Sequence, residues 1–337
     1  MSNPATIVLP SKGALSEPTL SFLKGCGLKV WKPNPRQYTG TIPAIDGLNV
    51  MFQRVKDVVY KVADGTAELG ITGLDVVYEY GDENIVVIHP DLEYGHCRLV
   101  VAVPEAWVDV ESMLDILDVA HDLRQSQHRN LRVATTYTRS ARQFLHEQGI
   151  HHFNLVKADG AIEAAPTLGY ADVVIDLTQT GTTIRENRLK ELNDGVILSS
   201  QACLIGNKLA LLNNLDLIEK LRLILENMDA SLLGRRYLNV TANIQGTSAE
   251  EVAARVLQNH VTTGLQGPTI APVYGREANE QNWFSVTIIV RDKQLLESVE
   301  YLRSIGGTQA VAFPTEFVFL EQSRTFERLQ ETLAELS

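Results

Sequence analysis

Short apolar runs alternate with amphipathic stretches over the first two thirds of the chain. Runs at 6–9, 99–103 and 131–135 have the length and composition of buried strands, whereas 55–62 and 113–126 carry apolar residues at helical spacing. This alternation predicts an α/β fold with a largely parallel sheet and helices on both of its faces. Ligands of such sheets bind beyond the carboxyl ends of the strands, so the loops at those ends are the candidate sites.

The pattern changes after Arg235 and Arg236. Strands are predicted at 237–244, 269–274, 283–290 and 308–313, and helices at 248–260 and 295–305. That order, βαββαβ, predicts a ferredoxin-like module at the end of the chain.

The chain is also predicted to cross twice between two lobes. The crossings are expected near Val103 and after Asn187, because another apolar strand follows at 196–205. Two lobes joined in this way enclose a hinged cleft. The expected boundaries are 1–103 plus 190–230 for the first lobe, 104–189 for the second lobe and 231–337 for the terminal domain.

Composition narrows the class of protein. With 337 residues and 45% hydrophobic content the chain can bury more than one core, and it has no signal-like start and no apolar stretch of about 18 residues. Cys26, Cys97 and Cys203 lack metal-ligand spacing. The net charge of −11 argues against a nucleic-acid surface. We therefore expect a cytoplasmic protein that binds neither membrane nor nucleic acid.

The most informative segment begins at Asp159 and ends at Arg188. Its β-branched run 173–175 predicts a buried strand that delivers Asp176 into a turn with four threonines and Gly181, and a helix follows. Hydroxyls and the free N–H groups of a helix start favour an anionic oxygen, so the turn predicts a phosphate grip. Asp176 cannot bind phosphate itself and is expected to contact sugar hydroxyls or a phosphate-bound metal ion.

The same turn has an ordinary structural reading, because threonines also cap helices in many α/β proteins. Neither GxxxxGK[ST] nor GxGxxG occurs in the chain, which argues against a P-loop nucleotidase and a dinucleotide-binding dehydrogenase. The turn alone leaves both readings open.

Longer motifs are distributed over nearly the whole chain. They are PSKGAL at 10–15, RVKD at 54–57, DGTAELGITGLD at 64–75, RVATTY at 132–137, GAIEAAPTLGYADVVIDLTQTGTTIREN at 160–187, GPTIAPV at 267–273 and LRSIGGTQAV at 302–311. In this order they resemble ATP phosphoribosyltransferase, the first enzyme of histidine biosynthesis. The C-terminal module resembles the long form of that family.

The resemblance implies a two-lobed, periplasmic-binding-protein-like catalytic core with a C-terminal ferredoxin-like (βαββαβ) regulatory domain. It implies that N1 of the adenine of ATP attacks phosphoribosyl pyrophosphate, giving phosphoribosyl-ATP and pyrophosphate. Mg²⁺ is the expected cofactor, bound mainly through the pyrophosphate and with no protein ligand assigned. The residues implied in phosphoribosyl pyrophosphate binding are Asp176, Thr178, Gln179, Thr180, Gly181, Thr182 and Thr183.

The resemblance also implies catalytic residues and an ATP site. The catalytic residues are Glu163, Asp176, Lys12 and Arg54, and the ATP-binding residues are Lys12, Gly13, Asp75 and Tyr137. Lys12 and Arg54 are otherwise ordinary surface charges, Asp75 a helix N-cap and Tyr137 a packing residue. Ala14 departs from the family, which commonly carries an arginine there, and this removes an expected phosphate contact.

For the C-terminal domain, the resemblance implies that histidine binds between copies of the domain and favours a hexamer over active dimers. Leu265 and Thr269 match positions that line the effector pocket, and Asn243 stands where some relatives have an aspartate. Loss of that charge predicts weaker inhibition by histidine. A purely structural assembly domain is the alternative.

Two other classes of function stay open. A two-lobed solute-binding protein would use a hinged cleft to trap an anion, and a catalytically silent assembly subunit would explain Ala14. Substituting Asp176 or Thr180 separates an enzyme from a binding protein, because turnover would be abolished in the first and binding merely weakened in the second.

Overall fold

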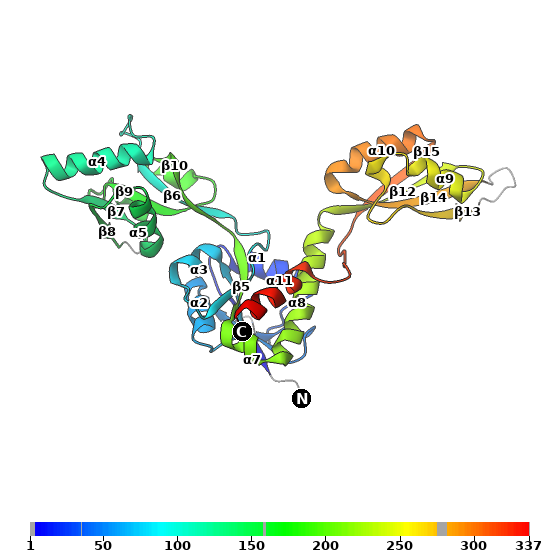
Figure 1. The fold of residues 1–337 in the computed structure, drawn as a ribbon, viewed down its shortest axis with the longest axis horizontal. Coiled ribbons are helices and arrows are strands. Elements are labelled where there is room, and N and C mark those ends of the chain that lie inside the picture. Colours follow the sequence, from blue (N-terminus) through cyan, green and yellow to red (C-terminus); the bar gives the residue numbers. More distant parts are fainter. Residues whose placement is uncertain (1–3, 35, 158–159, 275–281, 337) are drawn as a thin grey trace. The chain divides into compact units, whose positions relative to one another are not determined.

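The computed structural model describes residues 4–34, 36–157, 160–274 and 282–336 (Figure 1). The chain divides into two compact units, one made of residues 1–22, 29–220 and 333–337 and the other of residues 23–28 and 221–332. No helix in the described ranges is long and apolar enough to cross a membrane.

The first unit begins with a six-stranded sheet of order β2-β3-β1-β4-β11-β5. Its strands are β1 (Ala5–Pro10), β2 (Thr39–Thr41), β3 (Leu48–Gln53), β4 (Leu69–Gly73), β5 (Ile85–His89) and β11 (Ala202–Asn207). Strand β1 runs parallel to β3 and β4, whereas β11 runs antiparallel to β4 and β5. The sheet therefore receives its fifth strand from a part of the chain more than a hundred residues after β5.

A five-stranded sheet of order β10-β6-β9-β7-β8 forms the second lobe of this unit. Its strands are β6 (Cys97–Pro104), β7 (Leu131–Ala134), β8 (Phe153–Val156), β9 (Val173–Thr178) and β10 (Leu189–Ser200). Strand β7 is parallel to β8 and β9, and β6 is antiparallel to β9 and β10. Apolar clusters pack around β9: Val173 and Ile175 belong to one and Val174 to another.

The helices of the first unit follow the strand ends. They are α1 (Ser16–Gly25), α2 (Val55–Ala63), α3 (Leu74–Tyr80), α4 (Met113–Ser126), α5 (Thr138–Glu147), α6 (Thr182–Glu186) and α7 (Lys208–Asn213), with a 3₁₀ turn η1 at Ile162–Ala164. Helix α4 starts with a capping box, in which Ser112 and Asp115 each accept a hydrogen bond from the other's backbone N–H. Helix α2 packs Val58, Val59 and Val62 into the core beside β4.

Three features of this unit differ from the sequence prediction. Both sheets are mixed, because β11, β6 and β10 pair antiparallel. The apolar run 196–205 is two strands interrupted at Gln201, one in each sheet. Strands β6 and β10 lie in the same sheet, so the chain changes sheet between His89 and Cys97 and again at Gln201, not near residues 103 and 190.

The second unit contains the predicted ferredoxin-like module. After α8 (Leu215–Gly234) come β12 (Tyr237–Gln245), α9 (Ala249–Val256), η2 (His260–Thr262), β13 (Thr269–Val273), β14 (Trp283–Arg291), η4 (Asp292–Gln294), α10 (Leu295–Ser304), β15 (Gly307–Pro314) and α11 (Arg324–Leu336). The sheet order is β13-β14-β12-β15, with antiparallel pairing throughout. Helices α9 and α10 cover one face of the sheet (Figure 1), where Val252, Val256 and Leu302 are buried. The unit begins near Leu221, ten residues before the expected boundary at 231.

Candidate active site

The predicted phosphate grip is a loop between β9 and α6. Strand β9 is buried at 173–175, and the loop leaves its end at Thr178, whose side chain is 7% exposed. Gly181 has φ +73°, in the left-handed region that favours glycine, and it caps the start of α6. The threonines 180, 182 and 183 are exposed. The expected strand, turn and helix are therefore present, while Asp159 lies outside the described residues.

Hydrogen bonds fix the shape of this loop from within. The hydroxyl of Thr178 accepts from the backbone N–H of Gly181 at 2.8 Å, and the hydroxyls of Thr180 and Thr182 lie 2.9 Å apart. The loop therefore places a hydroxyl pair at its exposed surface while its buried base is held by Thr178.

Asp176 lies within β9, opposite Val100 of β6, and is half-buried. Burial raises the pKa of Asp176 to about 6; the N–H of Leu177, which donates to the carboxylate at 2.8 Å, opposes this, and the charge of Glu163 adds to it. The two acidic residues predicted to act together are thus close enough to influence each other. A half-buried carboxyl with a pKa near neutrality, two residues before an exposed loop, is typical of functional sites.

Asp75 and Tyr137, both predicted to bind ATP, are joined to each other. The hydroxyl of Tyr137 donates to Asp75 Oδ2 at 2.7 Å, and Ser200 Oγ donates to Asp75 Oδ1 at 2.6 Å. Asp75 is 4% exposed and is the second residue of α3, so it is not the N-cap, which is Gly73. Burial and the neighbouring charge of Asp75 raise the pKa of Tyr137, which keeps its hydroxyl protonated as the donor.

Glu79, which the sequence did not single out, completes this junction. Its buried carboxylate accepts hydrogen bonds from the backbone N–H groups of Arg139 and Ser140 at 2.8 and 2.9 Å, and from Ser140 Oγ at 2.9 Å. Glu79 thereby caps the first turn of α5 from a different helix, α3. No local sequence signal marks such a cap, because its partners lie about sixty residues away.

Lys12, Gly13 and Arg54 lie at the ends of first-lobe elements. Lys12 is exposed in the loop after β1, where Gly13 has φ +84°, and Arg54 is the exposed N-cap of α2. The loops after β1 and β3 are linked by the N–H of Ser11, which donates to the carbonyl of Gln53 at 2.7 Å. Lys12 and Arg54 thus stand on adjacent loops.

Three arginines of the second lobe form ion pairs within the protein. Arg129 and Arg132 both bind Asp172, at 2.6 and 2.8 Å, and Arg98 pairs with Glu191 at 2.9 Å. Burial would raise the pKa of Asp172, but the hydrogen bonds from Arg132 and Arg129 outweigh it and lower the pKa to about 2. Arg132, in the RVATTY motif, is therefore engaged in a structural cluster.

The described residues contain no group of three or more His, Cys, Asp or Glu side chains arranged to hold a metal ion. Two neighbouring carboxylates, those of Glu163 and Asp176, could contact an Mg²⁺ ion. Because Mg²⁺ in phosphate enzymes is usually held by one or two carboxylates plus substrate oxygens, this pair fits an ion that arrives with its substrate.

In the second unit, Leu265 and Thr269 line a cavity of about 640 Å³ together with Asn239 and Phe319. The predicted third member, Asn243, is not among the lining residues, and its side-chain amide donates to Gln309 at 3.2 Å. Asn239 precedes Asn243 by four positions in β12, so the two share a face of the sheet. The Oδ1 atom of Asn239 is buried without a hydrogen-bond partner among the described residues.

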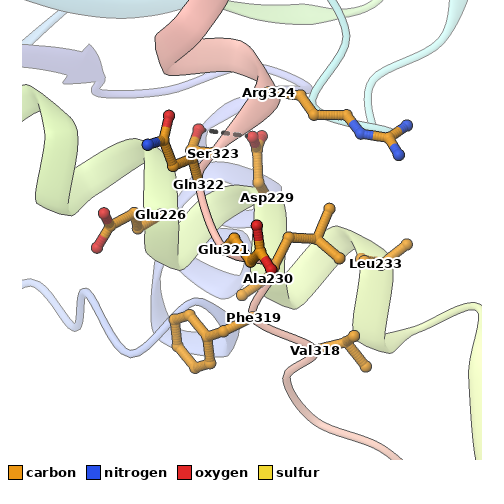
Figure 2. A pocket seen from close by; sticks show the side chains of 11 residues that line it. Glu226, Asp229, Ala230, Leu233, Val318, Phe319, Glu321, Gln322, Ser323 and Arg324 are labelled. Carbon is orange, nitrogen blue, oxygen red and sulfur yellow. Dashed lines mark hydrogen bonds between the residues drawn. The ribbon is translucent and has the colours of Figure 1, made fainter. Parts of the chain in front are cut away.

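A smaller cavity of about 250 Å³ lies between α8 and the segment 318–324 (Figure 2). Asp229 faces it, but its carboxylate accepts from Ser323 Oγ at 2.7 Å and from Thr325 Oγ1 at 2.8 Å. These bonds fasten the start of α11 to α8, which gives Asp229 a structural role.

Comparison with known proteins identifies the family of this chain. The model of the ATP phosphoribosyltransferase family matches residues 54–229, and the model of the HisG C-terminal domain matches residues 234–316. The chain belongs to the ATP phosphoribosyltransferase family. It is a pentosyltransferase of histidine biosynthesis, in the long form that carries the C-terminal domain.

Relatives of this transferase differ in how much of the chain they share. The chloroplastic ATP phosphoribosyltransferase 2 of Arabidopsis thaliana is 40% identical over 96% of this chain and 79% of its own length. The enzyme of Brucella melitensis is 45% identical over 60% of this chain and 89% of its own length. The ATP phosphoribosyl transferase (HisG:HisZ) complex of Thermotoga maritima shares the fold of 66% of this chain and 98% of the matched chain, with a TM-score of 0.51 at 22% identity.

Proposed function

We propose that this chain joins ATP to phosphoribosyl pyrophosphate at the loop 178–183 and the carboxylates before it. The adenine N1 of ATP forms a bond to the anomeric carbon of the sugar, and pyrophosphate leaves with the electron pair of the broken C–O bond. The single observation that carries this proposal is the loop that follows Asp176, in which Thr178 holds Gly181 and the hydroxyls of Thr180 and Thr182 lie side by side at the surface.

The protein supplies alignment and charge and needs no covalent nucleophile. Positive charge develops on the sugar ring as pyrophosphate departs, and the ionised carboxylates of Asp176 and Glu163 would stabilise it. The threonines 178, 180, 182 and 183, together with Gln179 and Gly181, would hold the sugar phosphate. Holding both reactants in the attack geometry is the largest remaining contribution.

Mg²⁺ would enter with the pyrophosphate and neutralise part of its charge. Glu163 and Asp176 are the residues of this chain that would contact the ion or its waters. Their proximity, evident in the effect of Glu163 on the pKa of Asp176, supports this assignment.

Lys12, Gly13 and Arg54 would bind phosphates of ATP or pyrophosphate on the first lobe. Their exposure on adjacent loops supports this role, and their two cations compensate for Ala14 at the position where an arginine was expected. Asp75 and Tyr137 would act at the ATP site mainly by holding the loop after β7 in place, since their polar atoms bind each other.

Histidine would inhibit the enzyme through the cavity lined by Leu265, Thr269 and Asn239. The unpartnered Oδ1 of Asn239 supports a ligand that donates a hydrogen bond, such as an ammonium group or an imidazole N–H. Asn243, on the same face, would bind more weakly than an aspartate. The active protein would be a dimer that histidine drives towards a hexamer in the cytoplasm.

The test is formation of phosphoribosyl-ATP from ATP, phosphoribosyl pyrophosphate and Mg²⁺, with pyrophosphatase to draw the reaction forward. Product that needs both substrates supports the proposal, and no product from a folded protein that binds phosphoribosyl pyrophosphate favours the silent subunit. A parallel histidine titration followed by light scattering tests regulation. Unchanged activity and mass at millimolar histidine would contradict that part alone.

A further inference from the structure

Arg185, on α6, folds back over the phosphate loop. Its Nη2 donates to the carbonyl of Thr180 at 3.1 Å and lies 3.5 Å from the hydroxyl of Thr182. Both acceptors are neutral, and among the described residues Arg185 forms no ion pair. The side chain is exposed, so its charge is open to a ligand that reaches the loop.

Gly181 makes room for this arrangement. A Cβ atom at Gly181 would lie 2.7 Å from Nη1 of Arg185 and 2.9 Å from Oε1 of Glu191. The guanidinium group and the carboxylate therefore approach the loop on the side that any larger residue would occupy. Glycine at this position thus has a steric reason beyond its φ of +73°.

Glu191 is itself held in place by a second arginine. Arg98 Nη2 lies 2.9 Å from Glu191 Oε2, and Arg98 pairs in register with Thr178, the residue at the base of the loop. Glu191 thus pairs with Arg98 through one carboxylate oxygen, and its other oxygen lies near Gly181, as does the Arg185 guanidinium group. The cluster of Arg98, Glu191 and Arg185 has a net charge of +1, which suits an added phosphate.

We propose that Arg185 is the cationic ligand of a phosphate monoester dianion at this loop, and that the Glu191 and Arg98 pair positions it. This deepens the proposed function and rests on it, because the sugar phosphate of phosphoribosyl pyrophosphate is such a monoester. A guanidinium group binds phosphate through two parallel N–H donors, which hydroxyls alone cannot provide. Arg185 exchanges the Thr180 carbonyl for phosphate oxygens when the substrate binds.

The test measures binding of ribose 5-phosphate and ribose 5-sulfate by calorimetry to the wild-type chain, Arg185→Gln, Arg185→Lys and a matched control, Arg142→Gln. Arg142 is an exposed arginine on α5 in the same lobe. The Arg185→Gln substitution is expected to weaken the binding of ribose 5-phosphate by about ten- to fiftyfold, in line with one lost charge-assisted interaction. Binding of the monoanionic ribose 5-sulfate should weaken by a smaller factor in Arg185→Gln. The Arg185→Lys variant should keep part of the preference for phosphate over sulfate.

A merely structural role would give a different result. If Arg185 only shaped the loop, the affinities for ribose 5-phosphate and ribose 5-sulfate would fall by the same factor in Arg185→Gln, and the proposal would be overturned. Affinity for ribose 5-phosphate as high as that of Arg142→Gln, or none in the wild-type chain, would overturn it as well. Failure of the proposed function would look different, because phosphoribosyl-ATP would then be absent although ribose 5-phosphate still bound through Arg185.

Discussion

Two aspartates of the β9 segment lie in opposite environments. Asp172, just before the strand, is 7% exposed and bound by two arginines, which hold its pKa at about 2. Asp176, four residues later, has no arginine partner among the described residues, and burial raises its pKa to about 6. Arginines of the protein therefore neutralise the charge of Asp172. The charge of Asp176 has no such partner among the described residues and can interact with a ligand.

The difference shows how to separate structural from functional carboxylates in this chain. An internally paired group stabilises the fold and gains nothing from a ligand, whereas an unpaired group in a partly buried position costs stability unless something else uses it. Asp75 and Glu79 belong with Asp172, because protein donors already bind them. Asp176 belongs to the second class, because among the described residues its carboxylate accepts a hydrogen bond only from the backbone N–H of the adjacent Leu177.

Replacing Asp176 by asparagine should give the largest effect on turnover. The variant keeps the shape of the side chain but loses the charge that would stabilise the sugar in the transition state, so kcat should fall by about a hundredfold or more. Steady-state assays with both substrates measure this. Asp172→Asn, compared as activity per folded molecule, is the control and should stay near wild type; a similar loss in both variants would erase the distinction.

Replacing Asp172 by asparagine should instead damage stability. It leaves Arg129 and Arg132 without their carboxylate, and because both guanidinium groups are about a third exposed, the loss should be about 1–2 kcal/mol, less than for a fully buried pair. Urea unfolding measures the loss. A change smaller than that in Asp118→Asn, an exposed aspartate on α4, would show that the arginines find other partners.

The pH dependence of turnover should report Asp176. Because its pKa is about 6 in the folded chain, kcat/KM should fall roughly tenfold per pH unit below that value, as the carboxylate becomes protonated. A profile measured from pH 5 to pH 8, with phosphate ionisation corrected by a substrate titration, tests this. A profile that stays flat down to about pH 5 would mean that the charge of Asp176 is not needed.

The smallest expected effect is a gain in stability. A raised pKa means that the folded chain holds the Asp176 proton more tightly than the unfolded chain, so stability is lost as pH rises from about 4 through about 6. Asp176→Asn removes this cost and should raise the unfolding free energy at pH 8 by about 1 kcal/mol. The lowered pKa of Asp172 has the opposite effect on stability. Its stabilising contribution should disappear as pH falls from about 4 to about 2. Chemical denaturation at three pH values compares both.

Sequence reasoning succeeded where the information is local. The run 173–175 predicted a buried strand, and the βαββαβ order of the second unit followed from the spacing of its own apolar residues. It failed where distant segments meet. The sequence around β3 does not predict a strand, because it adjoins a Pro- and Gly-rich stretch. The run 196–205 predicts a single strand, although its halves join different sheets.

The candidate site shows the same limit. The threonines and Gly181 were predicted from consecutive residues, but the roles of Glu79 and Glu191 depend on partners far along the chain. Arg185 was within the predicted segment, yet its direction depends on how the α6 turn packs against Gly181. Pairing register and side-chain direction, which decide these contacts, leave no pattern in a single sequence.

Strand β11 has a consequence for the order in which the chain acquires its structure. It lies between β4 and β5, so the first lobe lacks an internal strand until residues 202–207 have left the ribosome. The second lobe has all its strands within residues 97–200. Although domains usually fold from the N-terminus during synthesis, here the lobe translated later is the first with a complete sheet, and until then β4 has an unpaired edge that a chaperone or another nascent chain could bind.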